Sequence, residues 1–240
     1  MNLSLLSLGF LLGMRHAMES DHLAAVASLA TRGGSLRYNV WQGAAWGLGH
    51  TLTLFFFGSI VLLVDTVIPE RLSQGLEFAV GVMLVLLGAD VLRRLLRRRL
   101  HFHAHRHADG TLHLHAHSHA GERGHASLHH HPHPVPQHGF PLRALFVGLM
   151  HGMAGSAALI LLTLQTVSSP LAGLGYIALF GIGSIAGMTL LSLVIALPLR
   201  LSAAALTGLH NGMQALIGLG TVTLGCVMVY DIGFRGGLFT

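Results

Sequence analysis

The chain contains six apolar stretches that are each long enough to cross a lipid bilayer. They cover residues 3–30, 40–64, 76–96, 142–167, 173–197 and 212–230. A helix needs about 20 predominantly apolar residues to span the hydrocarbon core, where all backbone polar groups must be hydrogen-bonded internally. The chain as a whole carries little charge, since only 10% of its residues are Asp, Glu, Lys or Arg. The sequence therefore predicts an all-α polytopic membrane protein with six transmembrane helices and excludes a soluble globular domain.

The distribution of arginine predicts how these helices are oriented. All 14 basic residues other than histidine are arginines. Eleven lie in or beside the first, third and fifth loops, two lie on the opposite side at Arg71 and Arg235, and Arg15 lies within the first stretch. Because cytoplasmic loops carry an excess of basic residues, we expect a multi-pass protein of the cytoplasmic (inner) membrane with both termini outside. The basic composition then indicates contact with anionic lipid, and nucleic acid is not expected as a partner.

The two halves of the chain resemble each other, which predicts an internal repeat. At a shift of 135 residues, three residues of the first stretch match residues of the fourth: Gly13 with Gly148, His16 with His151, and Met18 with Met153. Glycine patterns also match between the second and fifth stretches and between the third and sixth. Each half contains an odd number of spans, so the second half must be inverted, and inverted repeats place a substrate site at their interface near the bilayer midplane. We therefore expect two three-helix repeats, over residues 1–96 and 142–240.

The first stretch is unusual because ionisable groups gather near its middle. These groups are Arg15, His16, Glu19, Asp21 and His22. Inside a bilayer they are costly unless they pair with one another or bind something. At about 100° per residue, three of them share one face of a regular helix: His16, Glu19 and His22. Asp21 points elsewhere, so either Glu19 completes the ligands of a bound ion or the helix is broken near Gly13 or Ser20.

Two further histidines lie inside predicted membrane helices and extend this group. They are His50 in the second stretch and His151 in the fourth, where it matches His16 in the repeat. Imidazole together with carboxylate suits first-row divalent metals such as nickel, cobalt and zinc. The predicted metal ligands are therefore His16, Asp21, His22 and His50, assisted by Glu19 and His151. The alternatives are a proton relay, or polar groups that are hydrogen-bonded by neighbouring helices.

Residues 97–141 form a long connection that carries 14 of the 19 histidines, mostly as His-x-His. This segment has few apolar residues and several glycines and prolines, so it cannot bury enough surface to fold alone. We expect a disordered cytoplasmic loop. Closely spaced imidazoles chelate divalent metals with modest affinity and low selectivity, so the loop would buffer ions that have crossed the membrane or collect ions about to leave.

Two motifs carry a resemblance to a known family. The first stretch contains H-x-x-x-x-D-H at His16, Asp21 and His22, and the second contains Leu-Gly-His-Thr at residues 48–51. With these motifs the chain resembles the nickel/cobalt transporter (NiCoT) family, and its shorter pattern is similar to the six-span urease-accessory membrane proteins of the same superfamily. The resemblance implies secondary transport of Ni²⁺ or Co²⁺ as substrate, with no prosthetic group. It also implies supply of urease or hydrogenase, with cytosolic nickel chaperones or maturation proteins as partners.

The function predicted from the sequence is a secondary permease that imports divalent nickel or cobalt, and not an enzyme. A nickel or cobalt efflux protein is the alternative within the same class. An intramembrane metalloenzyme is the alternative from another class, but His16 and His22 are six residues apart. They do not form the H-E-x-x-H pattern that places two ligands and a general base on one helical face. A metal-sensing or storage protein built around the histidine-rich loop is a third alternative.

Overall fold

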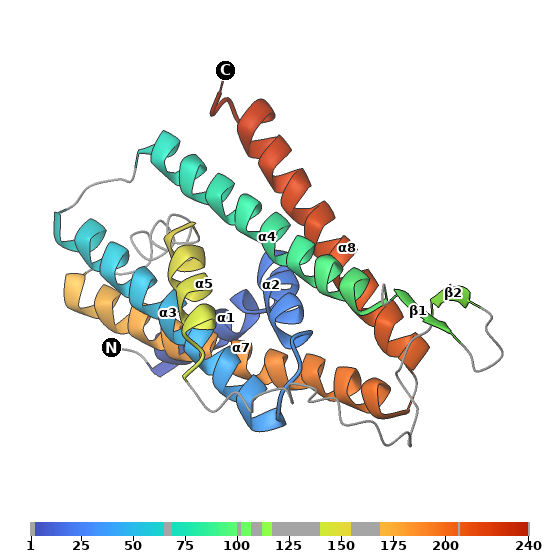
Figure 1. The fold of residues 1–240 in the computed structure, drawn as a ribbon. Helices are drawn as coiled ribbons and strands as arrows, with labels where there is room; N and C mark the ends of the chain where they lie inside the picture. The colour runs from blue at the N-terminus through green and yellow to red at the C-terminus, as the bar shows by residue number, and fades with distance from the viewer. Residues whose placement is uncertain are drawn as a thin grey trace.

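The computed structural model describes residues 3–64, 69–99, 102–106, 112–116, 140–154, 169–205 and 207–239 (Figure 1). The helices are α1 (Leu3–His16), α2 (Ser20–Ala30), α3 (Leu36–Val64), α4 (Glu70–Arg99), α5 (Leu142–Ala154), α7 (Pro170–Ala205) and α8 (Thr207–Tyr230). A short π-helical turn, η1 (Asp231–Arg235), follows α8, and two strands, β1 (Phe102–Arg106) and β2 (Leu112–Ala116), follow α4. Apart from these strands, the regular structure within the described ranges is helical, as the sequence predicts.

Four helices are long and apolar enough to cross a membrane: Leu36–Val64, Glu70–Arg97, Leu171–Ala203 and Thr207–Arg235. They correspond to the second, third, fifth and sixth predicted spans. The first predicted span is divided into α1 and α2, neither of which is long enough on its own. The fourth is described as the shorter apolar helix α5, and the remainder of the predicted range 142–167 lies outside the described residues. The chain is thus a membrane-spanning helical protein.

Large apolar side chains cover the outside of these helices. Phe56, Leu63, Leu86 and Leu216 are each more than 60% exposed. A soluble monomer does not present apolar surface on this scale, whereas a helix that is apolar all round is typical of a membrane span. An apolar exterior of this kind is typical of a membrane protein.

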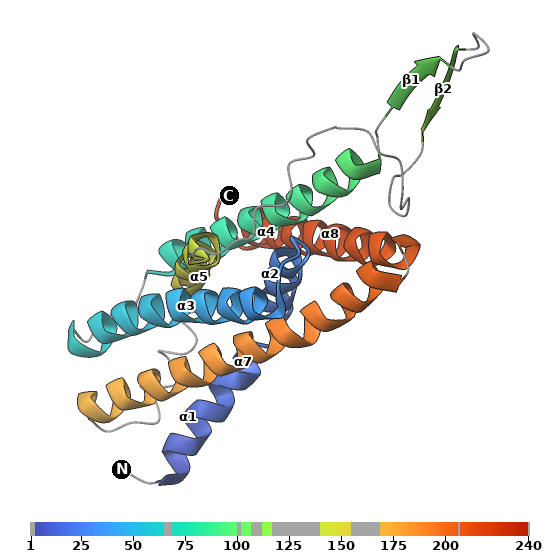
Figure 2. The same ribbon diagram turned by 60° about the horizontal axis from the view of Figure 1, so that its bottom comes forward.

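The four long helices pack in two pairs, α3 with α7 and α4 with α8. Helix α5 packs on α3, and α1 packs on α7. The short helix α2 lies between the two pairs and contacts α3, α4, α7 and α8 (Figure 2). Its residues Ala25, Val26 and Leu29 belong to the buried core together with Trp46 and Met188. The polar residues at the start of α2 are therefore held inside the bundle.

Glycines allow the closest helix contacts. A Cβ atom at Gly13 would overlap the backbone carbonyl of Phe180 on α7, and one at Gly148 would overlap that of Trp46 on α3. Small residues let backbones approach in this way in membrane helices, where lipid provides no hydrophobic drive for association. These two glycines bring α1 against α7 and α5 against α3, and each lies three residues before a histidine of the predicted site.

Part of the histidine-rich segment forms an antiparallel hairpin. The register of β1 and β2 sets His103 opposite His115 and His105 opposite His113. The structure differs here from the disordered loop expected over residues 97–141, and α4 continues to Arg99. A lack of apolar residues excludes a core but not a ladder of main-chain hydrogen bonds, and His-x-His matches the two-residue period of a strand. Most of the remaining segment lies outside the described residues.

Candidate metal centre

The first predicted helix is broken in its middle. Helix α1 ends at His16 and α2 begins at Ser20. Between them the Met18 N–H donates to the Arg15 carbonyl at 2.9 Å, and the Glu19 N–H donates to the His16 carbonyl at 3.0 Å. Glu19 then has extended backbone angles, φ −64° and ψ 151°. Of the two alternatives, the structure has the broken helix, whose free backbone ends inside the bundle are typical of ion sites in transporters.

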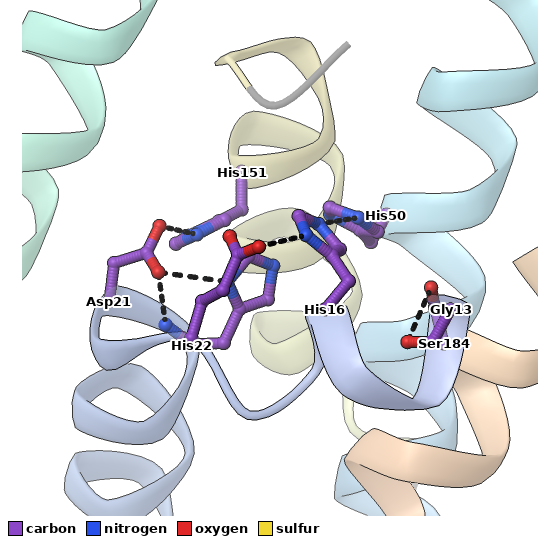
Figure 3. Close-up of polar contacts among 8 residues, drawn as sticks. Gly13, His16, Asp21, His22, His50, His151 and Ser184 are labelled. Atoms are coloured by element: carbon purple, nitrogen blue, oxygen red, sulfur yellow. Dashed lines mark hydrogen bonds and ion pairs between the residues drawn. The ribbon is translucent and has the colours of Figure 1, made fainter. Parts of the chain in front are cut away.

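Four histidines from four helices meet beside this break (Figure 3). The ring of His22 on α2 lies 4.2 Å from that of His151 on α5, 4.4 Å from that of His16 on α1 and 5.1 Å from that of His50 on α3, measured between centroids. The side chains of His22, His50 and His151 are buried, and His16 is 13% exposed. Residues that are as many as 135 positions apart in sequence thus form one cluster.

Asp21 holds two of the four rings. Its Oδ1 lies 3.0 Å from His22 Nδ1 and its Oδ2 lies 2.8 Å from His151 Nε2. An ionised carboxylate only accepts hydrogen bonds, so both ring nitrogens donate. The tautomer of each ring is thereby determined, and the lone pairs remain on His22 Nε2 and His151 Nδ1. A carboxylate that orients a histidine in this way is the usual support of a histidine metal ligand.

Glu19 plays a similar part for a third ring, that of His16, which in turn contacts the fourth, that of His50. Its Oε1 lies 3.0 Å from His16 Nδ1, which donates to it. His16 Nε2 therefore accepts, and His50 Nε2 donates to it across 3.2 Å. Because His50 Nε2 carries the proton, the free lone pair of the His50 ring is on Nδ1. The Glu19 side chain is 57% exposed, so this carboxylate lies at the edge of the cluster, whereas Asp21 is 23% exposed.

Several polar atoms of the cluster have no hydrogen-bond partner among the described residues. They are His22 Nε2, His50 Nδ1, His151 Nδ1 and Trp46 Nε1, all of them buried. Leaving a buried polar atom unpaired costs about 1–3 kcal/mol, so three such imidazole nitrogens in one place need a reason. Ligand atoms of His16, His22 and His50 lie within 4.8 Å of one another, as do those of Asp21, His22 and His151. The donor set suits a first-row divalent metal.

All six residues predicted from the sequence lie in this cluster. Its two carboxylates, Asp21 and Glu19, contact histidines of the cluster directly. The sequence analysis missed Trp46, whose ring centroid lies 5.5 Å from that of His22 and 5.7 Å from that of His151. The sequence spacing could have predicted Trp46, because it lies four residues before His50 and so shares its helix face. Phe180 was also missed; its ring lies 5.3 Å from that of His16.

The fold and the site define a class: a helical membrane protein with a buried cluster of histidines and carboxylates. The chain is 36% identical over 241 residues to urease accessory protein UreH of Bacillus sp. (strain TB-90), which covers 99% of this chain and 95% of that protein. The chain belongs to the family of this urease accessory protein. It is also 28% identical over 185 residues to chloroplast protein FOR GROWTH AND FERTILITY 1 of Arabidopsis thaliana, covering 75% of this chain and 46% of the plant protein. No family model and no solved structure matches the chain.

Proposed function

We propose that the protein is a secondary permease that imports divalent nickel, with cobalt as a second substrate, across the cytoplasmic membrane. The observation that carries this proposal is the pair of imidazole nitrogens His16 Nε2 and His50 Nε2, 3.2 Å apart beside the broken helix. Metal–nitrogen bonds of about 2.0–2.1 Å place two ligand nitrogens about 2.9–3.4 Å apart at bond angles between about 90° and 110°. The two rings thus already have the spacing of ligands that share one ion.

A divalent ion between these two rings would replace the proton that they share. The displaced proton would move to Nδ1 of His50, which is buried and has no partner among the described residues. His22 Nε2 supplies a third donor, and Asp21 and Glu19 balance the charge of the ion. The predicted ligand set is therefore His16, His22 and His50, with His151 close by and the carboxylates holding the rings in position. Asp21, placed among the ligands at first, has a positioning role in this arrangement.

The choice of nickel rests on the comparisons and on the chemistry of the donors. The UreH relative is named as an accessory protein of urease, and the motifs resemble those of nickel/cobalt transporters. Imidazole-rich sites favour nickel, cobalt and zinc over the alkaline earth ions, which prefer oxygen ligands. The nickel taken up would be passed to cytosolic chaperones or to urease or hydrogenase maturation proteins.

The contacts between helices support the predicted inverted repeats over residues 1–96 and 142–240. The repeat relates the contact of Gly13 with Phe180 to that of Gly148 with Trp46. Gly148 lies 135 residues after Gly13, and Phe180 lies 134 residues after Trp46. The other pair of helices has a similar relation at a shift of 137 residues: Gly88 approaches the carbonyl of Gly218, and Gly225 approaches that of Gly81. A substrate site between two such repeats is suited to alternating access. In this proposal the six spans have both termini outside and the histidine-rich segment in the cytoplasm.

The same arrangement argues against an enzyme. Metallohydrolases commonly use a carboxylate that is free of other partners as general base beside the bound ion. Here both carboxylates accept hydrogen bonds from rings of the cluster, Asp21 from two and Glu19 from one. The groups that a hydrolase would use for catalysis are therefore engaged in holding the histidines. The ion is substrate, and the protein requires no prosthetic group.

The proposal is tested by accumulation of labelled nickel at trace supply in cells that lack other nickel uptake systems. We expect His16→Ala and His50→Ala to reduce accumulation to the level of cells without the protein. Cys226→Ala is the matched control, because it removes another metal-binding side chain from an exposed position on α8. Full accumulation by either histidine variant would overturn the site. Counterflow of labelled nickel and cobalt in proteoliposomes, under inward and outward gradients, separates import from efflux.

A further inference from the structure

A half-open pocket lies at the other end of α2 from the histidine cluster. It has a volume of about 450 Å³ and lies between the C-terminal ends of α2 and α7 and the N-terminal ends of α3 and α8. Its polar lining consists of Thr31, Arg32, Asn39, Arg200, His210 and Gln214. A water molecule occupies about 30 Å³, so the cavity has room for a ligand. The elements that line it meet near the chain turns, at the boundary between membrane and water.

The charges around the cavity favour an anion. Its lining includes two arginines and, among the residues that the structure describes, no Asp or Glu. Arg32 forms an ion pair with Asp90 of α4, which also pairs with Arg94 at 3.3 Å, so this group of three carries one net positive charge. Arg200 is exposed and forms no ion pair within the described ranges. The N-terminal ends of α3 and α8 add partial positive charge and the C-terminal ends of α2 and α7 add partial negative charge, so the attraction for an anion comes from the arginines.

Asn39 is the group that indicates a ligand. Its side chain is 2% exposed and lines the cavity, yet its Oδ1 is buried without a hydrogen-bond partner in the described part of the chain. The neighbouring amide is paired: Gln214 Nε2 lies 2.8 Å from His210 Nε2, and His210 Nδ1 lies 3.1 Å from the Leu199 carbonyl. In the orientation described, the unpaired Oδ1 is an acceptor; with the amide turned by 180°, Asn39 presents its NH₂ group there instead and can donate to a phosphate oxygen.

We propose that this cavity binds the phosphate group of an anionic membrane lipid. A phosphate accepts hydrogen bonds from guanidinium and amide donors at once, which is what Arg32, Arg200 and Asn39 offer together. Anionic lipids are concentrated at the membrane surface where arginines gather, whereas a soluble phosphate must reach the cavity from water. The bound group joins the ends of four helices and so holds α2 against α3, α7 and α8. The site does not depend on which ion the histidine cluster binds.

Native mass spectrometry of the full-length protein in detergent tests this proposal, with phosphatidylglycerol and phosphatidylcholine as probes. We expect the wild type to retain phosphatidylglycerol in preference to phosphatidylcholine, and Asn39→Asp and Arg200→Gln to weaken that retention about tenfold. Asn39→Asp keeps the shape of the side chain and adds a negative charge. Arg200→Gln changes an exposed residue, so the fold is expected to be kept. Arg143→Gln is the matched control, because it removes an exposed arginine from α5, outside the cavity.

The outcomes separate the sources of the phosphate group. Loss of the preference in both cavity variants, but not in Arg143→Gln, supports the lipid site. A second outcome is that no lipid is preferred, while inorganic phosphate at millimolar concentration protects the wild type, but not the cavity variants, against heat. The site then binds soluble phosphate, and the proposal of a lipid ligand is overturned. Equal retention by all variants, with no effect of phosphate, overturns the anion site altogether. Nickel accumulation is a separate measurement and does not decide between these results.

Discussion

The buried histidine cluster and the histidine-rich segment bring their imidazoles together in different ways. In the cluster, four rings come from four helices; two carboxylates hold three of them, and His16 holds the fourth, that of His50. In the segment, 14 histidines lie close together along the chain, and the described hairpin sets four of them opposite one another across two strands. The comparison indicates that the number of histidines does not decide what a site does. Packing and carboxylate partners make a few imidazoles a defined site, whereas the segment offers many equivalent positions.

The largest expected effect comes from removing one ring of the cluster. His22→Ala should abolish nickel accumulation at trace supply, because His22 touches all the other rings of the cluster and supplies a buried nitrogen. His22→Gln, which keeps more of the side-chain volume, should have the same effect, and circular dichroism would confirm that both variants are folded. Uptake at the wild-type level by a folded variant would contradict the view that the cluster, unlike the histidine-rich segment, is a defined site.

A carboxylate that positions the rings should matter less than a ring. Asp21→Asn keeps the shape but replaces one acceptor oxygen by an NH₂ group, so one of the two histidines loses its partner. We expect nickel affinity to fall about 10–100-fold, as is usual when the support of a metal ligand is lost. Glu19→Gln should cost less, because this side chain is more exposed and holds one ring. Equilibrium dialysis of the purified protein measures both, and a larger loss for Glu19→Gln would reverse the proposed roles.

A change in packing should affect the cluster and leave the histidine-rich segment unchanged. Gly148→Ala places a methyl group where the carbonyl of Trp46 lies, so α5 and His151 must move away from α3. Overpacking of this kind costs about 1–3 kcal/mol, and we expect a lower thermal unfolding midpoint and lower uptake. Gly220→Ala is the control, since nothing lies near its Cβ position. Equal midpoints for the two variants would show that close contact at Gly148 is not needed.

The smallest expected effect on uptake comes from the hairpin. Replacing its four paired histidines, His103, His105, His113 and His115, by Ala should leave uptake within about twofold of wild type, since the ion crosses at the cluster. Isothermal titration measures the nickel that the segment binds weakly. The amount bound should fall further in this variant than in a variant with Ala at His125, His129, His130 and His131. The hairpin register sets the four hairpin histidines opposite one another, and residues opposite one another in an antiparallel pair have Cβ atoms about 4.5–5.5 Å apart, close enough to share one ion. Equal losses would show that histidine number alone governs binding by this segment.

Much of the fold follows from the length of the apolar stretches, because a bilayer demands helices of a certain length. The helix ends are less predictable. Helix α4 continues to Arg99 and α7 covers Pro170–Ala205, beyond the predicted ranges, since a helix can extend past the apolar region when its polar ends reach water. The hairpin was missed for another reason. Asp109-Gly110 between two alternating stretches is a strong hairpin signal, but the prediction of disorder rested on composition alone and did not use it.

The sequence by itself determined that the chain crosses a membrane and that histidines and acids within it must be paired or bound to an ion. Both conclusions follow from the cost of polar groups in hydrocarbon, which depends on residue type and not on tertiary contacts. Only the tertiary structure decided that the first span breaks between His16 and Ser20, and that Asp21 reaches His151 on another helix. The direction of each ring depends on which helices pack together, and that packing comes from glycine contacts between residues more than 100 positions apart.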